Sequence, residues 1–364
     1  MMTQLVLPAA ARICEARPGP GRQTGAALLM AMMIVALITT MASAMVWQQW
    51  RAVQVESAER ARTQSDWILA GALDWARLIL REDARSNAGK TDHLGEPWAV
   101  PLAEARLSTF LAADKNNNSN SEEDGPEAFL SGSITDAQSR YNLRNLVTGQ
   151  GTLDPKELKV LQRLFETIDI SPELAGVIAN AMVNSTPVNA AQAPLPGGAP
   201  TGQAVSGGTP SPAQAAAPRD LAKLTVDPHS VMQLRWFGLE VETLRRMEPY
   251  VTLLPAATAV NVNTAPREVL VAVFENMDLG TAERMTQARQ RAPMSGPEDL
   301  KKVLSASVKL EPMPNIAYQT NYFEIRGRLR LDDKVLEERS LIHRKDYRNI
   351  KTVYRERLNL RSDP

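Results

Sequence analysis

The stretch "GRQTGAALLMAMMIVALITTMASAMVWQQW", residues 21–50, decides the fold, because it is apolar from Ala26 to Trp47 and carries no charge between Arg22 and Arg51. A helix rises about 1.5 Å per residue, so this run is long enough to cross a bilayer core of about 30 Å. The arginines that precede it favour a cytoplasmic N-terminus. The run is therefore a candidate membrane span.

The helical pattern continues beyond this run. From Arg51 to Arg85 the chain has no proline and a single glycine, Gly71. Apolar residues recur there at helical spacing: Ile68, Leu69, Ala72, Leu73, Ala76, Ile79 and Leu80. The spacing predicts one helix that begins in the bilayer and ends packed on a soluble domain.

The composition argues against an enzyme. Lys and Arg total 41, as do Asp and Glu, so no global field attracts nucleic acid or anionic lipid. The one cysteine, Cys14, precedes the apolar run, and the three histidines, His93, His229 and His343, lie far apart in the sequence. Disulfides, cysteine metal sites and a histidine-based catalytic site are not expected.

Segments with strand character flank a helical block. In residues 102–111 and 128–138 the side chains alternate in the way that predicts strands. In residues 321–344 apolar and charged residues alternate around an Asp-Asp-Lys turn, which predicts a hairpin. Between them, residues 151–313 predict short helices, with residues 184–220 as a flexible loop rich in Pro, Gly and Ala. Three helix starts carry N-cap and first-turn signals: Asp154 with Pro155 and Glu157, Ser171 with Pro172, and Ser295 with Pro297 and Glu298. The helical block therefore reads as an insertion into a sheet domain.

Gly25, followed at once by Ala26 and the apolar helix, resembles the type III leader of type IV pilins and type II secretion pseudopilins. In those families a membrane peptidase cuts after the glycine. Two other readings stay open on the leader alone. One is an ordinary signal anchor, and the other is a secretory signal cut after Ala44, which would leave Met45 as the first residue.

Four blocks taken together resemble the general secretion pathway protein K family. The most specific is "AVNVNTAPREVLVAVFENMDLGTAERMTQARQRAPMSGPEDL", residues 259–300, which is helix-hairpin-helix-like. The others are residues 92–102, 132–147 and 238–255, in the same order as in the family. Within the first block, Thr264 is expected to be an N-cap and Pro266 to stand in the first turn.

The resemblance implies an α+β fold: a pilin-like long N-terminal helix on a small antiparallel sheet, with a large all-helical domain (helix-hairpin-helix or SAM-like) inserted in the sheet domain. The expected divisions are a removed leader (1–25), a transmembrane helix (26–47), a periplasmic helix (48–86), a pilin-like domain (87–150 and 314–350), the inserted helical domain (151–313) and a tail (351–364).

The resemblance also implies a minor pseudopilin of type II secretion that caps the periplasmic tip of the pseudopilus and starts its assembly. Prepilin peptidase would cut between Gly25 and Ala26, and the Ala26 amine would be methylated. The implied partners are minor pseudopilins I and J, prepilin peptidase, the inner-membrane assembly platform, and the secretin or an exported protein. The implied location is the bacterial inner membrane, crossed once, with the C-terminal domain in the periplasm.

Met30 is the fifth residue after the expected cut. Major pilins and pseudopilins generally carry a glutamate there, whereas an apolar residue is typical of protein K. Since a carboxylate in lipid is costly without an opposite charge, a subunit with no neighbour above it is expected to lack the glutamate.

A membrane-anchored helix-hairpin-helix protein that binds nucleic acid is the alternative of another class. Against it, the hairpin carries Asp278 and Glu283. Arg284, Arg289 and Arg291 are most simply a solvated face. No nucleic-acid partner is expected.

Calcium has weak candidates in the polar loop of residues 114–127: Asp114, Glu122, Glu123 and Asp124. Their spacing departs from an EF-hand loop, so a solvated loop is the simpler reading. Protein K relatives can bind calcium through an acidic loop after the second capped helix, but here a tract without carboxylates follows Asn184 as far as Asp220.

Overall fold

The computed structural model describes residues 24–86, 91–107, 128–185, 227–331 and 334–361. Helix α1 (Thr24–Ser86) has 63 residues. The chain divides into two compact units, residues 1–64 and 65–364. In the first unit, every side chain from Gly25 to Arg60 is exposed. By length and composition, α1 is the one helix in the described part of the chain that could cross a membrane.

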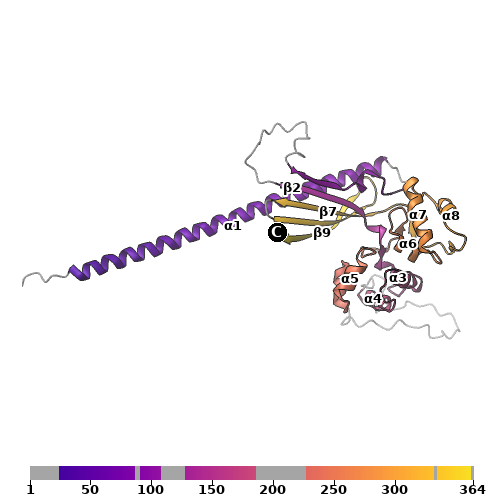
Figure 1. Cartoon of the computed structure of the whole chain (residues 1–364), viewed down its shortest axis with the longest axis horizontal. Coiled ribbons are helices and arrows are strands. Elements are labelled where there is room, and N and C mark those ends of the chain that lie inside the picture. Colours follow the sequence, from indigo (N-terminus) through magenta and orange to yellow (C-terminus); the bar gives the residue numbers. More distant parts are fainter. Residues whose placement is uncertain (1–23, 87–90, 108–127, 186–226, 332–333, 362–364) are drawn as a thin grey trace, which may run out of the picture. The chain divides into compact units, whose positions relative to one another are not determined.

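The second unit contains a five-stranded antiparallel sheet (Figure 1). Its order is β1 (Leu102–Arg106), β2 (Ala128–Asp136), β7 (Tyr322–Leu331), β8 (Lys334–Arg344) and β9 (Ile350–Arg361). A short 3-10 helix, η1 (Pro97–Ala99), precedes β1. The hairpin predicted for residues 321–344 is confirmed as β7 and β8, and its Asp332-Asp333 tip lies outside the described residues.

One face of this sheet is covered by the part of α1 that belongs to the second unit. Leu69, Leu73, Ala76 and Leu80 are buried, and their steps of four, three and four residues keep them on one helix face. Leu73, Ala76 and Leu80 share a cluster with residues of the facing strands: Ile134, Phe323, Ile325 and Ile342. The prediction of one long helix whose end packs on the sheet domain is confirmed.

A large inserted domain lies between β2 and β7. Its helices are η2 (Ala137–Ser139), η3 (Leu143–Leu146), α3 (Pro155–Thr167), α4 (Glu173–Ser185), η6 (Val231–Phe237), α5 (Val241–Met247), α6 (Arg267–Val273), α7 (Leu279–Arg291) and α8 (Pro297–Val303). Two-residue strands form two parallel pairs: β3 (Tyr141–Asn142) with β4 (Val251–Thr252), and β5 (Val260–Asn261) with β6 (Ile316–Ala317). The domain has its own core, which includes Leu161, Phe165, Leu270 and Phe274.

The boundaries differ from the sequence prediction. The insertion begins directly after Asp136 instead of at residue 151, because Tyr141, Leu143 and Leu146 are buried in the helical core. The tail expected for 351–364 is wrong as far as residue 361, because β9 pairs with β8. The inserted domain is also not purely helical, since it contains the two short strand pairs.

The N-cap predictions have mixed outcomes. Asp154 caps α3 as predicted, since its carboxylate accepts from the backbone N–H of Lys156 at 2.8 Å. Ser295 does not cap α8; Gly296 stands at the cap position, and Ser295 donates its hydroxyl to Asp299 at 2.8 Å. Thr264 does not cap α6 either; Pro266 stands at the cap position, and the Thr264 hydroxyl donates to Asp136.

Candidate functional site

The predicted processing residues lie at the start of α1. Gly25, Ala26 and Met30 all have exposed positions in the helix, which begins at Thr24, and the rest of the expected leader lies outside the described residues. Exposed apolar side chains follow along this segment, with Met30 65% and Trp47 61% exposed. Such a surface is stable only when lipid or other apolar helices cover it.

Asp136 is the centre of the connection between sheet and insertion. Its Oδ2 accepts from the Thr264 hydroxyl at 2.5 Å and from the Asn261 side-chain amide at 2.9 Å. Its Oδ1 accepts from the Thr320 hydroxyl at 2.6 Å and from the backbone N–H of Gln138 at 2.7 Å. Burial raises the pKa of Asp136, and these four donors act against that rise. The motif "NVNTAP" thus binds the motif "SITDAQ", which explains the failed Thr264 cap.

A second buried connection centres on Arg344 at the end of β8. Its guanidinium donates to Asp83 Oδ2 near the end of α1 at 2.6 Å and to the Asp92 carboxylate in the following loop. It also donates to the carbonyl oxygen of Thr320 at 3.2 Å, and Asp92 in turn accepts from the Thr320 N–H at 2.7 Å. Thr320 therefore joins the Arg344 cluster to Asp136.

A third buried connection centres on Glu324. Glu324 of β7 accepts from Arg140 at 2.6 Å and from Arg326 at 2.7 Å, and Arg339 lies 3.5 Å away. Burial alone would raise the pKa of Glu324, but the charges and hydrogen bonds of Arg140 and Arg326 lower it to about 2. Since Arg140 belongs to the insertion, this pair also ties the two parts together.

The described residues contain one close group of possible metal ligands, Asp83, Asp92 and Glu96, whose carboxylate oxygens lie within 4.8 Å of one another. The Arg344 guanidinium already supplies a positive charge to Asp83 and Asp92. Glu96 accepts from Trp98 Nε1 at 2.6 Å. These contacts account for the cluster without a metal. The calcium candidates Asp114, Glu122, Glu123 and Asp124 lie outside the described residues, so calcium binding stays a prediction.

The helix-hairpin-helix-like segment is built for packing rather than for phosphate. Asp278 caps α7 and accepts from the Thr281 N–H at 2.5 Å, so a carboxylate stands where a phosphate would need free amides. Arg289 is not on a solvated face, contrary to the sequence prediction. It donates to the carbonyl oxygens of Val262 and Ala265 at 2.7 and 2.6 Å, and burial lowers its pKa to about 10.

The comparisons agree with this architecture. The sequence matches the family "Type II secretion system (T2SS), protein K" over residues 139–256 and again over residues 260–320. The chain belongs to the type II secretion system protein K family. Three partners of Asp136 lie in the second matched region, namely Asn261, Thr264 and Thr320, whereas Asp136 and Gln138 lie just before the first.

Curated relatives cover most of the chain. The type II secretion system protein K of Pseudomonas aeruginosa is 29% identical over 318 residues, which are 86% of each chain. The protein of the same name from Pectobacterium carotovorum is 27% identical over 335 residues, 88% of this chain and 93% of the relative. A chain in the crystal structure of the GspK-GspI-GspJ complex from enterotoxigenic Escherichia coli shares the fold, with a TM-score of 0.55 and 17% identity. That match covers 82% of this chain and 98% of the other.

The sequence alone did not identify Asp136 and Arg344 as residues that connect the sheet to the inserted domain. The one available signal for Asp136 is that it lies in one of the blocks that carry the family resemblance. Arg344 gives no such signal, because its partners are 24 to 261 residues away in the chain.

Proposed function

We propose that this protein is the minor pseudopilin at the periplasmic tip of a type II secretion pseudopilus, where it starts assembly together with minor pseudopilins I and J. The observation that carries the proposal is the combination of an exposed apolar helix with a bulky insertion fixed to the pilin-like sheet. The apolar segment serves membrane insertion and packing on partner helices. The insertion is too wide to be stacked within a thin filament, so it suits only an end.

The rigidity of the connection between the sheet and the inserted domain supports this role. Asp136, Arg344 and Glu324 tie the insertion to the sheet through charged and polar side chains that are mostly buried. A cap that starts a filament must keep one orientation to the subunit below it. Three such buried connections resist bending between the two parts, because breaking any of them leaves a buried polar group without its partner.

Processing of the N-terminus belongs to the same proposal. Prepilin peptidase cuts between Gly25 and Ala26, and the new Ala26 amine is methylated. Met30 then places an apolar side chain where a carboxylate would need an amine from a subunit above. The mature protein is anchored once in the inner membrane, with residues after the span in the periplasm. There it works with the assembly platform and meets the secretin or the exported protein.

Copurification tests the proposal. The full chain is produced in membranes together with pseudopilins I and J of the same system, extracted in detergent, and isolated through a tag on this chain. We expect I and J to copurify in fixed ratio. Recovery of this chain without either subunit, under conditions in which I and J still associate with each other, contradicts the proposal.

A further inference from the structure

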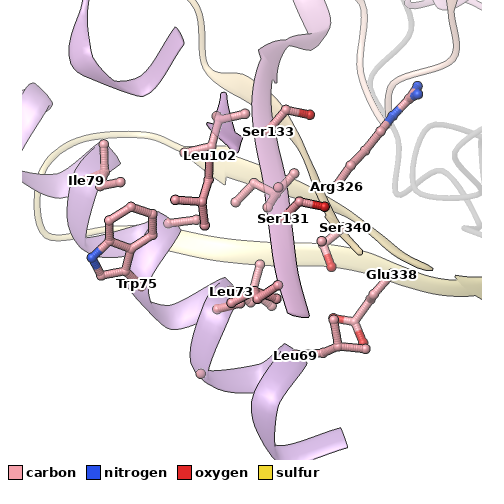
Figure 2. Close-up of a pocket in the computed structure, with 18 of the residues that line it drawn as sticks. Leu69, Leu73, Trp75, Ile79, Leu102, Ser131, Ser133, Arg326, Glu338 and Ser340 are labelled. Carbon is pink, nitrogen blue, oxygen red and sulfur yellow. The ribbon is translucent and has the colours of Figure 1, made fainter. Parts of the chain in front are cut away.

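A cavity of about 630 Å³ lies between α1 and the strands β1 and β2, and the charged residues in its lining are already paired (Figure 2). Apolar side chains such as Leu73 and Leu102 form much of that lining. The pairs are Arg326 with Glu324, and Glu338 with Arg355 and Arg357. Three more arginines of β7 and β8 also form ion pairs with carboxylates: Arg330, Arg339 and Arg344. Most positive charge on these strands is therefore neutralised within the fold.

The turn that joins β8 to β9 has the opposite character. The segment 345–351, which comprises this turn and the start of β9, carries three exposed cations, Lys345, Arg348 and Lys351. None of the three forms an ion pair with another described residue. Since the whole chain has no net charge, this segment is a local excess of positive charge that attracts anionic groups.

The one carboxylate of the segment, Asp346, is bound inside the turn. Its Oδ1 accepts from the backbone N–H groups of Arg348 at 2.7 Å and Asn349 at 2.8 Å, and its Oδ2 accepts from the Asn349 side-chain amide at 2.8 Å. The Asn349 side-chain bond, followed by the backbone bonds, lowers the pKa of Asp346. The backbone N–H of Lys345 also donates to the carbonyl oxygen of Asn349 at 3.0 Å. These bonds fix the shape of the turn, whose three cations outnumber its single carboxylate.

An aromatic side chain holds one of these cations at the surface. The Arg348 guanidinium lies 5.1 Å from the ring centroid of Tyr347, which is 39% exposed. Stacking on the ring leaves the guanidinium N–H groups free to donate to an acceptor from outside. Arginine and tyrosine are enriched in protein–protein interfaces, which favours a protein as the source of the anionic group.

The position of the turn also favours a protein over a lipid headgroup. Arg344, directly before the turn, donates to Asp83 near the C-terminal end of α1. The candidate membrane span occupies the opposite end of this helix in the sequence. The turn thus belongs to the part of the sheet domain at which α1 ends.

We propose that the segment 345–351 docks a carboxylate-rich segment of a partner protein, whose side chains pair with Arg348 and Lys351. Complementary charge of this kind speeds association and selects the partner. The proposal does not rest on the proposed function. It adds a contact surface that lies outside α1 and outside the inserted domain.

Fluorescence anisotropy of a labelled hexaglutamate peptide with the full chain in a non-ionic detergent tests this surface, with hexaglutamine as the neutral probe. Arg348→Gln combined with Lys351→Gln removes two cations of the segment. Lys301→Gln combined with Lys302→Gln is the matched control, because it removes two exposed cations that already pair with Glu298 and Asp299. Thermal unfolding confirms that both double variants are folded.

We expect the turn variant to bind hexaglutamate about fivefold more weakly than wild type, the effect of losing two exposed ion pairs, while the control binds like wild type. Added salt should weaken wild-type binding. The proposal is overturned if wild type does not bind hexaglutamate, if it binds hexaglutamine equally well, or if the control loses as much affinity as the turn variant. Vesicles of phosphatidylglycerol provide a further arm. If the turn variant loses vesicle binding but keeps hexaglutamate binding, the turn docks lipid headgroups and the proposal is wrong. Each of these results leaves the minor pseudopilin role to the copurification experiment.

Discussion

The Thr320 hydroxyl donates to Asp136 Oδ1 at 2.6 Å, although the two residues are 184 positions apart. Asp136 is the last residue of β2, where the chain leaves the sheet, and Thr320 lies two residues before β7, where it returns. One hydrogen bond therefore closes the inserted domain at its base. The insertion and the sheet should consequently unfold together.

Removal of the Asp136 carboxylate should strongly destabilise the protein. Asp136→Ala leaves two hydroxyls, an amide and a backbone N–H buried without their acceptor, at a cost of about 1–3 kcal/mol for each unsatisfied group before relaxation. We expect a loss of at least about 3 kcal/mol in the free energy of unfolding, measured by urea denaturation. Asp74→Ala, which breaks an exposed pair with Arg77, is the control and should change stability by less than about 1 kcal/mol. Equal effects of the two substitutions would contradict the role given to Asp136.

Arg344→Met should cost about 3–5 kcal/mol, because it leaves Asp83 and Asp92 buried without their cation. Burial already raises the pKa of Asp83, and the Arg344 hydrogen bond and charge act against that rise. Adding Asp83→Asn to the Arg344 variant should therefore recover part of the loss. A double-mutant cycle in denaturant measures the coupling; strictly additive effects would show that the pair does not interact.

Stability should fall in acid through Glu324. Its pKa is lowered from 4.5 to about 2 in the folded protein, so the folded state binds its proton less readily than the unfolded chain. Its contribution is therefore present above about pH 4.5 and is lost as the pH falls toward about 2. Glu324→Gln should remove about 2–3 kcal/mol of this acid-sensitive stability. The free energy of unfolding of wild type and variant is measured from about pH 6 down to the acid transition. Parallel curves for the two proteins would contradict the prediction.

Gly71→Ala should raise the free energy of unfolding by about 0.5–1 kcal/mol, because alanine favours the helix and its methyl group meets open space. Thermal or urea unfolding of the variant measures the change. A destabilised variant would mean that the fold itself needs the glycine.

Short sequence patterns predicted the elements that depend on residues close to one another in the sequence. The apolar spacing of α1, the Asp154 cap and the hairpin of β7 and β8 all follow from residues within a few positions of one another. The connection between the sheet and the inserted domain could not be predicted in this way. Thr264 has every local feature of an N-cap, yet a buried carboxylate 128 positions earlier takes its hydroxyl.

Strand β9 could not be predicted for a similar reason. Its sequence, "IKTVYRERLNLR", is rich in charge and reads as a tail. Arg355 and Arg357 pair across the sheet with Glu338 of β8, at 2.9 and 3.0 Å. The charges that make the segment look unstructured are thus satisfied by a neighbouring strand, which sequence alone does not reveal.

The mature N-terminus tests the central claim most directly. Mass spectrometry of the protein from cells with and without prepilin peptidase should give a methylated Ala26 start only when the peptidase is present. Without the peptidase the leader should remain attached. A start at Met45, or the same N-terminus in both strains, would contradict the assignment of the apolar helix as a pseudopilin assembly segment.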